Sequence, residues 1–395
     1  MKVALLFWRL SPYHHARLSA AGKFVDVAAV EACAVDNIYA WEKLEGEVHY
    51  ERITLQERHP VGKRERVDFC KRMFYVLDKI NPDVVAIPGW SFVDALSGLS
   101  WAGSRGKPVL IMSDSTVDDA PRVAWREAIK RQIVSLCSSA LVAGTPHAEY
   151  IQALGMAPER ICSGYDVVDN AYFANQAADA RIRMPQLREE YRLPENYFLA
   201  SNRFVEKKNL FRLIEAFARY RTQCLAPWSL VLLGDGALRE SLTAKIHSLN
   251  LKDHVHLPGF KQYRDLPKYF GCTKAFIHAS TIEQWGLVVN EAMASGLPVL
   301  VSSRCGCAAD LVKNGVNGFT FDPFDIEAIT QGMMKVSAPG FPLMAFGQAS
   351  QRIIADWGPE RFAAGVTSAA EKALEVGPKK PLLVQRLLLR GLILR

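Results

Sequence analysis

Short apolar runs alternate with stretches of helical periodicity along most of the chain. In the first half, the apolar runs are residues 3–7, 24–30, 83–88, 108–112 and 140–143. Residues 48–55 alternate between apolar and polar positions and predict a further strand, and residues 64–80 predict a helix with an apolar face. Strands that are apolar throughout are typical of a parallel sheet covered by helices on both sides. The pattern therefore predicts a Rossmann-like α/β domain.

The same alternation begins again near residue 197. The later predicted strands are residues 197–201, 229–233, 254–257, 275–279, 298–301 and 317–321. Residues 179–196 between the two series are charged and punctuated by prolines, which indicates a domain boundary. We therefore expect two doubly wound domains that face each other across a cleft formed by the carboxyl ends of their strands.

Composition supports this division without choosing a ligand. At 395 residues the chain exceeds one ordinary core, and 49% hydrophobic with 23% charged residues is typical of a soluble globular protein. A net charge of +7 is compatible with nucleic acid, phosphorylated ligands or an anionic membrane. Eight cysteines, scattered mostly through apolar segments, indicate reduced thiols and a cytoplasmic protein. The first apolar run is interrupted at Arg9 and is too short for a signal peptide.

The last stretch, residues 379–395, combines leucine-rich clusters with Arg386, Arg390 and Arg395. It is too short and too charged to span a bilayer. Two interpretations remain open. The stretch is an interfacial helix, with leucines in the acyl boundary and arginines on lipid phosphates, or it is a basic helix docked on its own N-terminal domain or a frayed end.

Two carboxylates, Glu283 and Glu291, stand eight positions apart around a predicted helix start. Glu283 follows the predicted strand 275–279, and Glu291 lies inside the predicted helix 288–294. In parallel α/β sheets, ligands bind beyond the carboxyl ends of the strands, where helix N-termini present free N–H groups. An anion bound at residues 286–288 would have a carboxylate on each side.

Two cations are predicted at the same end of the second sheet. Arg203 follows the strand 197–201, and Lys208 precedes the next helix. Fixed cations of this kind stabilise a diphosphate leaving group where no metal is supplied. The turn Gly234-Asp235-Gly236 either lets the backbone approach a phosphate or only connects strand to helix. It lacks the later glycine of the dinucleotide fingerprint, which disfavours a dehydrogenase.

Five motifs occur in a specific order. They are Arg203 with Lys208, Gly-Asp-Gly at 234–236, His-Leu-Pro-Gly-Phe at 256–260, Glu283 and Glu291 followed by Ala-Met-Ala-Ser-Gly-Leu-Pro-Val, and Asn-Gly-Val-Asn-Gly at 314–318. This order resembles the family-4 retaining glycosyltransferases of the GT-B fold, of the group 1 type, most strongly over residues 197–325. The resemblance implies an N-terminal acceptor domain at 1–190, a nucleotide-sugar domain at 191–355, a helix at 356–378 that returns to the N-terminal domain, and the basic tail at 379–395.

The resemblance also implies roles for individual residues. Arg203 and Lys208 would clamp the diphosphate, Glu291 would hold the ribose hydroxyls, and Glu283 would contact the transferred sugar. The remaining donor-binding positions would be Gly234, Gly259, Phe260, Trp285, Gly286 and Leu287. Gly306 and Cys307 stand where the family usually has a glycine pair, which is a departure. Because the chain has no Asp-x-Asp run, transfer is expected to need neither a metal nor a cofactor beyond the nucleoside-diphosphate sugar.

The acceptor side departs further from the family. Asp114 stands where many members have a histidine, and it could orient the sugar, take the acceptor proton or only cap a turn. The predicted loop 8–15, ahead of a predicted helix at 16–22, replaces a glycine-rich loop. Its Tyr13, His14 and His15 are acceptor-contact candidates, or solvated side chains. The catalytic set is thus expected to be Glu283, Asp114, Arg203 and Lys208.

These features together predict a retaining, metal-independent transferase, with a UDP-sugar preferred to a GDP-sugar as donor and a glycan or lipid-linked acceptor. We expect a cytoplasmic protein, peripheral on the inner face of the membrane through its tail, that binds no nucleic acid. A nucleotide-sugar epimerase of the same fold and a non-catalytic nucleotide-sugar-binding subunit are the alternatives. Dependence on an acceptor distinguishes the three.

Overall fold

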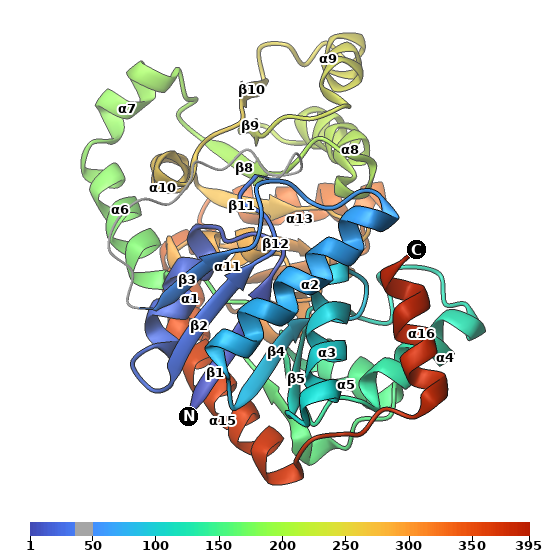
Figure 1. The fold of residues 1–395 in the computed structure, drawn as a ribbon. Coiled ribbons are helices and arrows are strands. Elements are labelled where there is room, and N and C mark those ends of the chain that lie inside the picture. The colour runs from blue at the N-terminus through green and yellow to red at the C-terminus, as the bar shows by residue number, and fades with distance from the viewer. Residues whose placement is uncertain (36–49) are drawn as a thin grey trace. The chain divides into compact units, whose positions relative to one another are not determined.

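The computed structural model describes residues 1–35 and 50–395 (Figure 1). The chain divides into two compact units. Unit 1 comprises Met1–Val167 and Pro359–Arg395, and unit 2 comprises Val168–Gly358. Each unit is built on one parallel β-sheet with helices packed against it (Figure 1). This confirms the predicted fold class, α/β with two doubly wound domains.

The sheet of unit 1 has seven parallel strands in the order β3-β2-β1-β4-β5-β6-β7. The strands are β1 Lys2–Phe7, β2 Asp26–Glu31, β3 Glu51–Thr54, β4 Val84–Pro88, β5 Val109–Ser113, β6 Ser139–Val142 and β7 Ile161–Ser163. The helices are α1 Pro12–Ala21, α2 Lys63–Ile80, α3 Val93–Arg105, α4 Ala124–Val134, α5 Thr145–Ala153, α15 Pro359–Val376 and α16 Leu383–Ile393. The predicted strand 48–55 corresponds to β3, and its first two positions lie outside the described residues.

Both faces of this sheet are buried, as the apolar strands predict. Along β1, Ala4 and Leu6 belong to the core shared with α2 and α3, whereas Val3 and Leu5 belong to the core shared with α1 and α15. Successive side chains of a strand point to opposite faces, so a strand covered on both sides has no polar positions in its centre. The order of the strands changes direction between β1 and β4, which is the point where ligands bind in such sheets.

The sheet of unit 2 has six parallel strands in the order β10-β9-β8-β11-β12-β13. The strands are β8 Tyr197–Ser201, β9 Ser229–Leu233, β10 Val255–Gly259, β11 Ala275–His278, β12 Val299–Ser302 and β13 Gly318–Phe321. The helices are α6 Asn170–Ile182, α7 Met184–Tyr191, α8 Leu210–Gln223, α9 Arg239–Ser248, α10 Leu266–Cys272, α11 Leu287–Ala294, α12 Ala308–Leu311, α13 Ile326–Ser337 and α14 Leu343–Ile354. Short 3₁₀ turns include η2 Glu206–Lys208 and η3 Tyr263–Asp265.

The units divide at different positions from those predicted. Unit 2 begins at Val168 instead of residue 191, because α6 packs against α10 and α11. A Cβ at Gly271 of α10 would lie 2.6 Å from the Ala177 carbonyl oxygen of α6, so the two helices approach closely at a glycine. At the other end, α15 belongs to unit 1, where it packs on β6 and β7.

The basic tail forms α16, which docks on its own unit. The helix packs against α3, and Leu389 and Ile393 join the core beneath it. Gln385 extends the contact to α4, because its side-chain amide donates to Gln132 Oε1 at 3.0 Å and to Ser135 Oγ at 3.2 Å. The structure thus shows the docked form of the tail. Among the described residues, no helix has the length and apolarity needed to cross a membrane.

Candidate functional site

The Gly-Asp-Gly turn of unit 2 lies directly against the segment that carries Arg203. Gly234 has a φ of +128°, and a Cβ there would lie 1.7 Å from the Asn202 carbonyl oxygen. The Phe204 N–H donates to the Asp235 carbonyl oxygen at 2.8 Å, which ties the two loops together. Glycine is required here because the backbones leave no room for a side chain. The turn therefore fixes the backbone on both sides of Arg203.

Lys208 is held by a second set of backbone contacts. It ends η2, and Asn209 next to it adopts a left-handed conformation with a φ of 57°. The Asn209 side-chain amide donates to the Ala279 carbonyl oxygen at 3.0 Å, and the Thr281 N–H donates to the Lys207 carbonyl oxygen at 2.9 Å. These bonds attach η2 to the loop after β11. The β11 loop is the one that carries Glu283.

Three side chains converge on one carboxylate oxygen of Glu283. The Lys208 ammonium forms an ion pair with Glu283 Oε2. His278 Nε2 lies 3.0 Å from the same oxygen, and the Ser280 hydroxyl donates to it at 3.2 Å. The Glu283 side chain is only 13% exposed. Sequence reasoning placed Lys208 and Glu283 in one site but missed His278 and Ser280. The signal was a histidine and a serine at the end of an otherwise apolar strand.

The charges of this cluster follow from burial and from the Lys208 contact. Burial alone would raise the pKa of Glu283, but the Lys208 ammonium and the hydrogen bond to His278 hold that pKa well below its usual range. Burial lowers the pKa of His278, so its ring is neutral at pH 7. A neutral ring donates Nε2–H to Glu283 and leaves Nδ1 unprotonated, and among the described residues Nδ1 has no hydrogen-bond partner. Glu283 is therefore a fixed anion.

The Cys-Gly-Cys segment after β12 supports the Glu283 loop. The Gly306 N–H donates to the Glu283 carbonyl oxygen at 3.0 Å, and the Cys307 N–H donates to the Trp285 carbonyl oxygen at 3.0 Å. The Cys305 thiol donates to the same Trp285 oxygen at 2.9 Å, and both thiols are free and buried. Position 307 is the departure from the expected glycine pair. With cysteine there, the N–H groups of Gly306 and Cys307 still donate to the Glu283 loop.

The helix α11 begins at the end of that loop. Gly286 has a φ of +99°, and a Cβ there would lie 2.7 Å from Cys305 Sγ, so glycine is needed at the turn. The following helix starts at Leu287, and in its first turn the Val289 N–H donates to the Gly286 carbonyl oxygen at 2.8 Å. The Trp285 ring is 2% exposed and stacks on Trp357 with centroids 5.1 Å apart. Its ring supports the fold, while its backbone lies in the loop.

The second carboxylate lies deeper in the unit. Glu291 of α11 is 1% exposed. Burial, and secondarily the Glu291 charge, raise the pKa of Tyr263, so the two side chains are electrostatic neighbours. Tyr263 also stacks on Tyr172 of α6 with centroids 5.1 Å apart. The expected base-side loop is close to the glycine turn, because the Gly234 N–H donates to the Gly259 carbonyl oxygen at 3.1 Å. The next residue, Phe260, is 40% exposed.

In unit 1, Asp114 follows β5 and lies in a partly buried group of charges. Burial, and then the charges of Asp166 and Asp119, raise the pKa of Asp114 to about 7, while Arg17 acts in the opposite direction. Arg17 forms an ion pair with Asp166 at 3.1 Å and donates to the Val167 carbonyl oxygen at 3.0 Å. The pKa places the protonation change of Asp114 near neutral pH, as a group that exchanges a proton with an acceptor requires.

The raised pKa gives a stability prediction for Asp114→Asn. The folded protein binds the Asp114 proton more tightly than the unfolded chain, whose carboxyl titrates near pH ~4. The stabilising contribution is therefore complete below that pH and is lost as the pH rises through about 7. Relative to the unsubstituted chain, Asp114→Asn should gain roughly 1–3 kcal/mol between about pH 4 and pH 8 in urea unfolding. The exposed Asp118→Asn is the control, and a constant difference for Asp114→Asn would contradict the shift.

The three acceptor candidates Tyr13, His14 and His15 lie in the first turn of α1, not in the predicted loop. The helix starts at Pro12 because a fixed φ suits the first helical position. His14 Nδ1 accepts from the Ser11 N–H at 3.1 Å, which satisfies one of the free donors at the helix start. Burial lowers the pKa of His14 to about 3, so this ring is neutral and serves the helix.

Comparisons with known proteins place part of this chain in a family. Residues 184–350 match the model of the family "Glycosyl transferases group 1". The lipopolysaccharide core biosynthesis glycosyltransferase LpsE of Rhizobium meliloti is 31% identical over 140 residues, which are 35% of this chain and 39% of that protein. The mannosylfructose-phosphate synthase of Agrobacterium fabrum is 27% identical over 224 residues, 53% of this chain and 48% of that protein. The chain spans less than half the length of these two relatives.

Solved structures match nearly the whole chain in fold. Anabaena HepE in complex with UDP has a TM-score of 0.72 at 16% identity, covering 93% of this chain and 98% of that one. The sucrose-phosphate synthase of Thermosynechococcus elongatus has a TM-score of 0.73 at 18% identity, covering 95% and 99%. Residues 184–350 therefore match the group 1 glycosyltransferase family, within a chain that has the two-domain α/β fold of GT-B glycosyltransferases.

Proposed function

We propose that this chain is a retaining, metal-independent glycosyltransferase of family 4, which moves a sugar from a nucleoside-diphosphate sugar to an acceptor hydroxyl. The contact of Lys208 with Glu283, fixed by His278 and Ser280, is the observation that carries the proposal. It places a cation for a leaving diphosphate beside an anion that accepts hydrogen bonds from sugar hydroxyls. UDP is the preferred nucleotide, supported by a neighbour of the same fold that was solved with UDP.

On the donor side, each residue has a distinct task. Arg203 and Lys208 bind the diphosphate, aided by the free N–H groups at Leu287 where α11 begins. Glu283 orients the transferred sugar, and Glu291 binds the ribose. As the bond between the anomeric carbon and the diphosphate oxygen breaks, negative charge develops on that oxygen. The ammonium of Lys208 stabilises this charge without a metal ion.

Retention at the anomeric carbon follows from attack by the acceptor hydroxyl on the face from which the diphosphate departs. Glu283 is not assigned as a nucleophile. One of its oxygens is already bonded to Lys208, His278 and Ser280, and its depressed pKa marks a weakly basic carboxylate. Such a carboxylate is suited to hold hydroxyl groups and poorly suited to form a covalent bond to the sugar.

On the acceptor side, Asp114 takes the proton of the attacking hydroxyl. Its pKa of about 7 allows it to be ionised before transfer and protonated after it. Tyr13 and His15 in the first turn of α1 are candidates to contact the acceptor, together with His14. We propose a glycan or lipid-linked acceptor in polysaccharide or glycolipid assembly, which the name of the lipopolysaccharide relative supports.

Nucleotide binding tests the donor assignment. Titration of the purified chain with UDP, GDP and ADP should give the tightest binding for UDP, and EDTA should not weaken it. Arg203→Ala should weaken UDP binding by about 10- to 100-fold, because a hydrogen bond to a charged group is worth about 1.5–3 kcal/mol. The matched control is Arg219→Ala, whose guanidinium faces Glu327 on the surface of the same unit at 3.8 Å. UDP affinities that do not differ between the two variants would contradict the assignment.

Product analysis tests the reaction class. Labelled donor incubated with the protein should yield a labelled glycan or lipid only when an acceptor extract is added. A rearranged free sugar formed without acceptor would instead establish an epimerase. Tight UDP binding with no turnover in any extract would establish a non-catalytic binding subunit. Either result would overturn the proposed transfer.

A further inference from the structure

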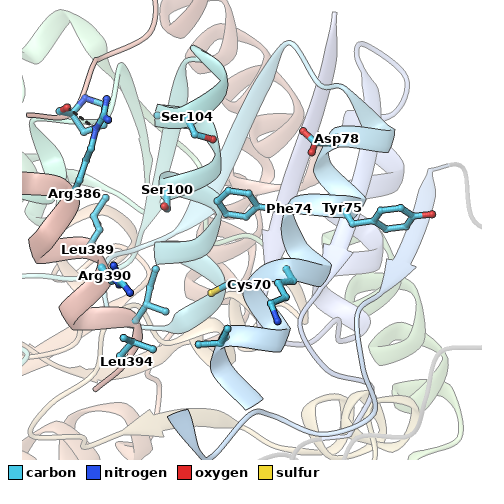
Figure 2. Close-up of a pocket in the computed structure, with 15 residues that line it drawn as sticks. Cys70, Phe74, Tyr75, Asp78, Ser100, Ser104, Arg386, Leu389, Arg390 and Leu394 are labelled. Atoms are coloured by element: carbon cyan, nitrogen blue, oxygen red, sulfur yellow. Dashed lines mark hydrogen bonds between the residues drawn. The ribbon is translucent and has the colours of Figure 1, made fainter. Parts of the chain in front are cut away.

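A groove on unit 1 runs between α2, α3 and the docked helix α16 (Figure 2). Its volume is about 920 Å³, which is within the range of small-molecule sites. Apolar side chains line its walls, namely Val67, Phe74, Leu389, Ile393 and Leu394. Figure 2 shows Phe74 of α2 facing the groove opposite Leu389 and Arg390 of α16. The groove is separate from the nucleotide-binding residues, which all belong to unit 2.

The helix α16 has two apolar faces. One face is docked, with Leu389 and Ile393 only 3% and 8% exposed. The opposite face and the preceding residue Leu382 carry what we call the outer leucine patch, formed by Leu382, Leu383, Val384 and Leu387, which are 61–74% exposed. Docking therefore buries one set of apolar side chains of this helix and leaves another set exposed to water. Exposed apolar residues grouped on one helix mark a site of association with another surface.

Positive charge borders both apolar surfaces. Residues 379–395 contain Lys379, Lys380, Arg386, Arg390 and Arg395 and no acidic residue. Arg386 and Arg390 line the groove together with Lys71 of α2, whose ammonium forms an ion pair with Asp68 at 3.0 Å. Among the described lining residues, the acidic one is Asp78. The Arg105 guanidinium donates two hydrogen bonds of 2.8 Å to its carboxylate and offsets its charge. The surface that α16 presents is consequently apolar at its centre and cationic at its border.

We propose that α16, while docked on α2 and α3, binds the surface of an anionic phospholipid bilayer. The outer leucine patch enters the boundary between headgroups and acyl chains, and Arg386 and Arg390 bind lipid phosphates. The groove takes the acyl chain of a lipid whose phosphate these cations hold. A soluble protein partner would need no pair of arginines beside its apolar contact, whereas an anionic bilayer matches both the exposed leucines and the adjacent arginines. The inference stands independently of the proposed transfer reaction.

Vesicle binding by the full chain tests the proposal. The protein should co-sediment with phosphatidylcholine vesicles that contain phosphatidylglycerol and remain in solution with phosphatidylcholine alone. Arg386→Gln with Arg390→Gln should weaken binding roughly 30-fold, since each cation near an anionic surface contributes about a factor of five. Leu383→Gln with Leu387→Gln should weaken it by at least about tenfold through lost apolar contact. Because these side chains point outward, the variants should keep the unfolding temperature of the parent.

Controls of the same type lie on unit 2. Leu225→Gln with Met344→Gln changes two exposed apolar side chains, and Lys252→Gln with Lys313→Gln removes two exposed charges. Both pairs should leave vesicle binding unchanged. Equal binding to neutral and anionic vesicles, or full binding by either α16 variant, would overturn the proposal. So would dimerisation in the absence of vesicles that the leucine variant abolishes, because the patch would then bind a second copy of this chain.

Discussion

Lys208→Ala is expected to lower the rate constant of sugar transfer by about 100- to 1,000-fold, with a smaller effect on the affinity for the donor. The ammonium acts in two ways. In the proposed reaction it stabilises the diphosphate as charge develops during bond breaking, and in the structure it helps to hold the pKa of Glu283 well below its usual range. Without it, His278 and Ser280 remain to hold Glu283, so the sugar-binding carboxylate keeps part of its orientation. Single-turnover transfer from labelled donor measures the rate constant apart from binding.

The control for this variant is another lysine–glutamate pair of the same unit. Lys245 on α9 lies 2.5 Å from Glu215 on α8, and both side chains are about one-third exposed. A surface pair of this kind contributes about 0–1 kcal/mol to stability, so Lys245→Ala should leave the transfer rate unchanged. If Lys208→Ala kept more than about a tenth of the parent rate, the leaving group would be stabilised elsewhere. An equal loss in both variants would indicate general destabilisation of unit 2.

Gly234→Ala is expected to destabilise unit 2 by about 3 kcal/mol or more and to weaken UDP binding. Two costs add at this position. The backbone has a φ of +128°, which side chains rarely adopt, and the new Cβ would lie 1.7 Å from the Asn202 carbonyl oxygen. The loop that carries Arg203 would have to move, so its guanidinium would lose its position. Urea unfolding reports the first effect, and UDP titration at a temperature where the variant is folded reports the second.

Gly340→Ala separates the two costs. Gly340 also belongs to unit 2 and has a φ of +83°, but no atom lies within 4 Å of the position that its Cβ would take. Its cost should be that of the left-handed backbone alone, about 1–2 kcal/mol, with no change in UDP affinity. Equal destabilisation by the two substitutions would show that the Asn202 segment moves away from the new Cβ at no cost in stability. In that case the turn would not be what positions Arg203.

Much of the fold was predictable because the strands are buried on both faces. Runs such as residues 3–7 and 140–143 contain no polar position, and strands of this kind are typical of a parallel sheet with helices on both sides. The order of Arg203, Lys208, Glu283 and Glu291 likewise identified the strand ends where a ligand would bind. In doubly wound sheets, chain order alone determines which loops gather at one edge.

Other features depend on contacts between segments far apart in the chain. The first boundary was placed too late, because the packing of α6 on α10 at Gly271 is a matter of shape and leaves no periodic signal. His14 belonged to a predicted loop, yet it accepts a hydrogen bond from Ser11 at the start of α1. A histidine before a helix has many possible partners, and only the backbone geometry selects one.

The sequence by itself predicted the class of fold, the family that residues 184–350 match and the two charges that meet, Lys208 and Glu283. Periodicity and motif order can both be recognised in the sequence, without knowing which residues lie close together in space. Only the tertiary structure showed that His278 and Ser280 hold Glu283, that the glycine turn holds the Arg203 segment, and that α16 docks with one face while leaving its outer leucine patch exposed. These features depend on which loops come within hydrogen-bond distance or van der Waals contact, and that is decided by packing across the whole unit.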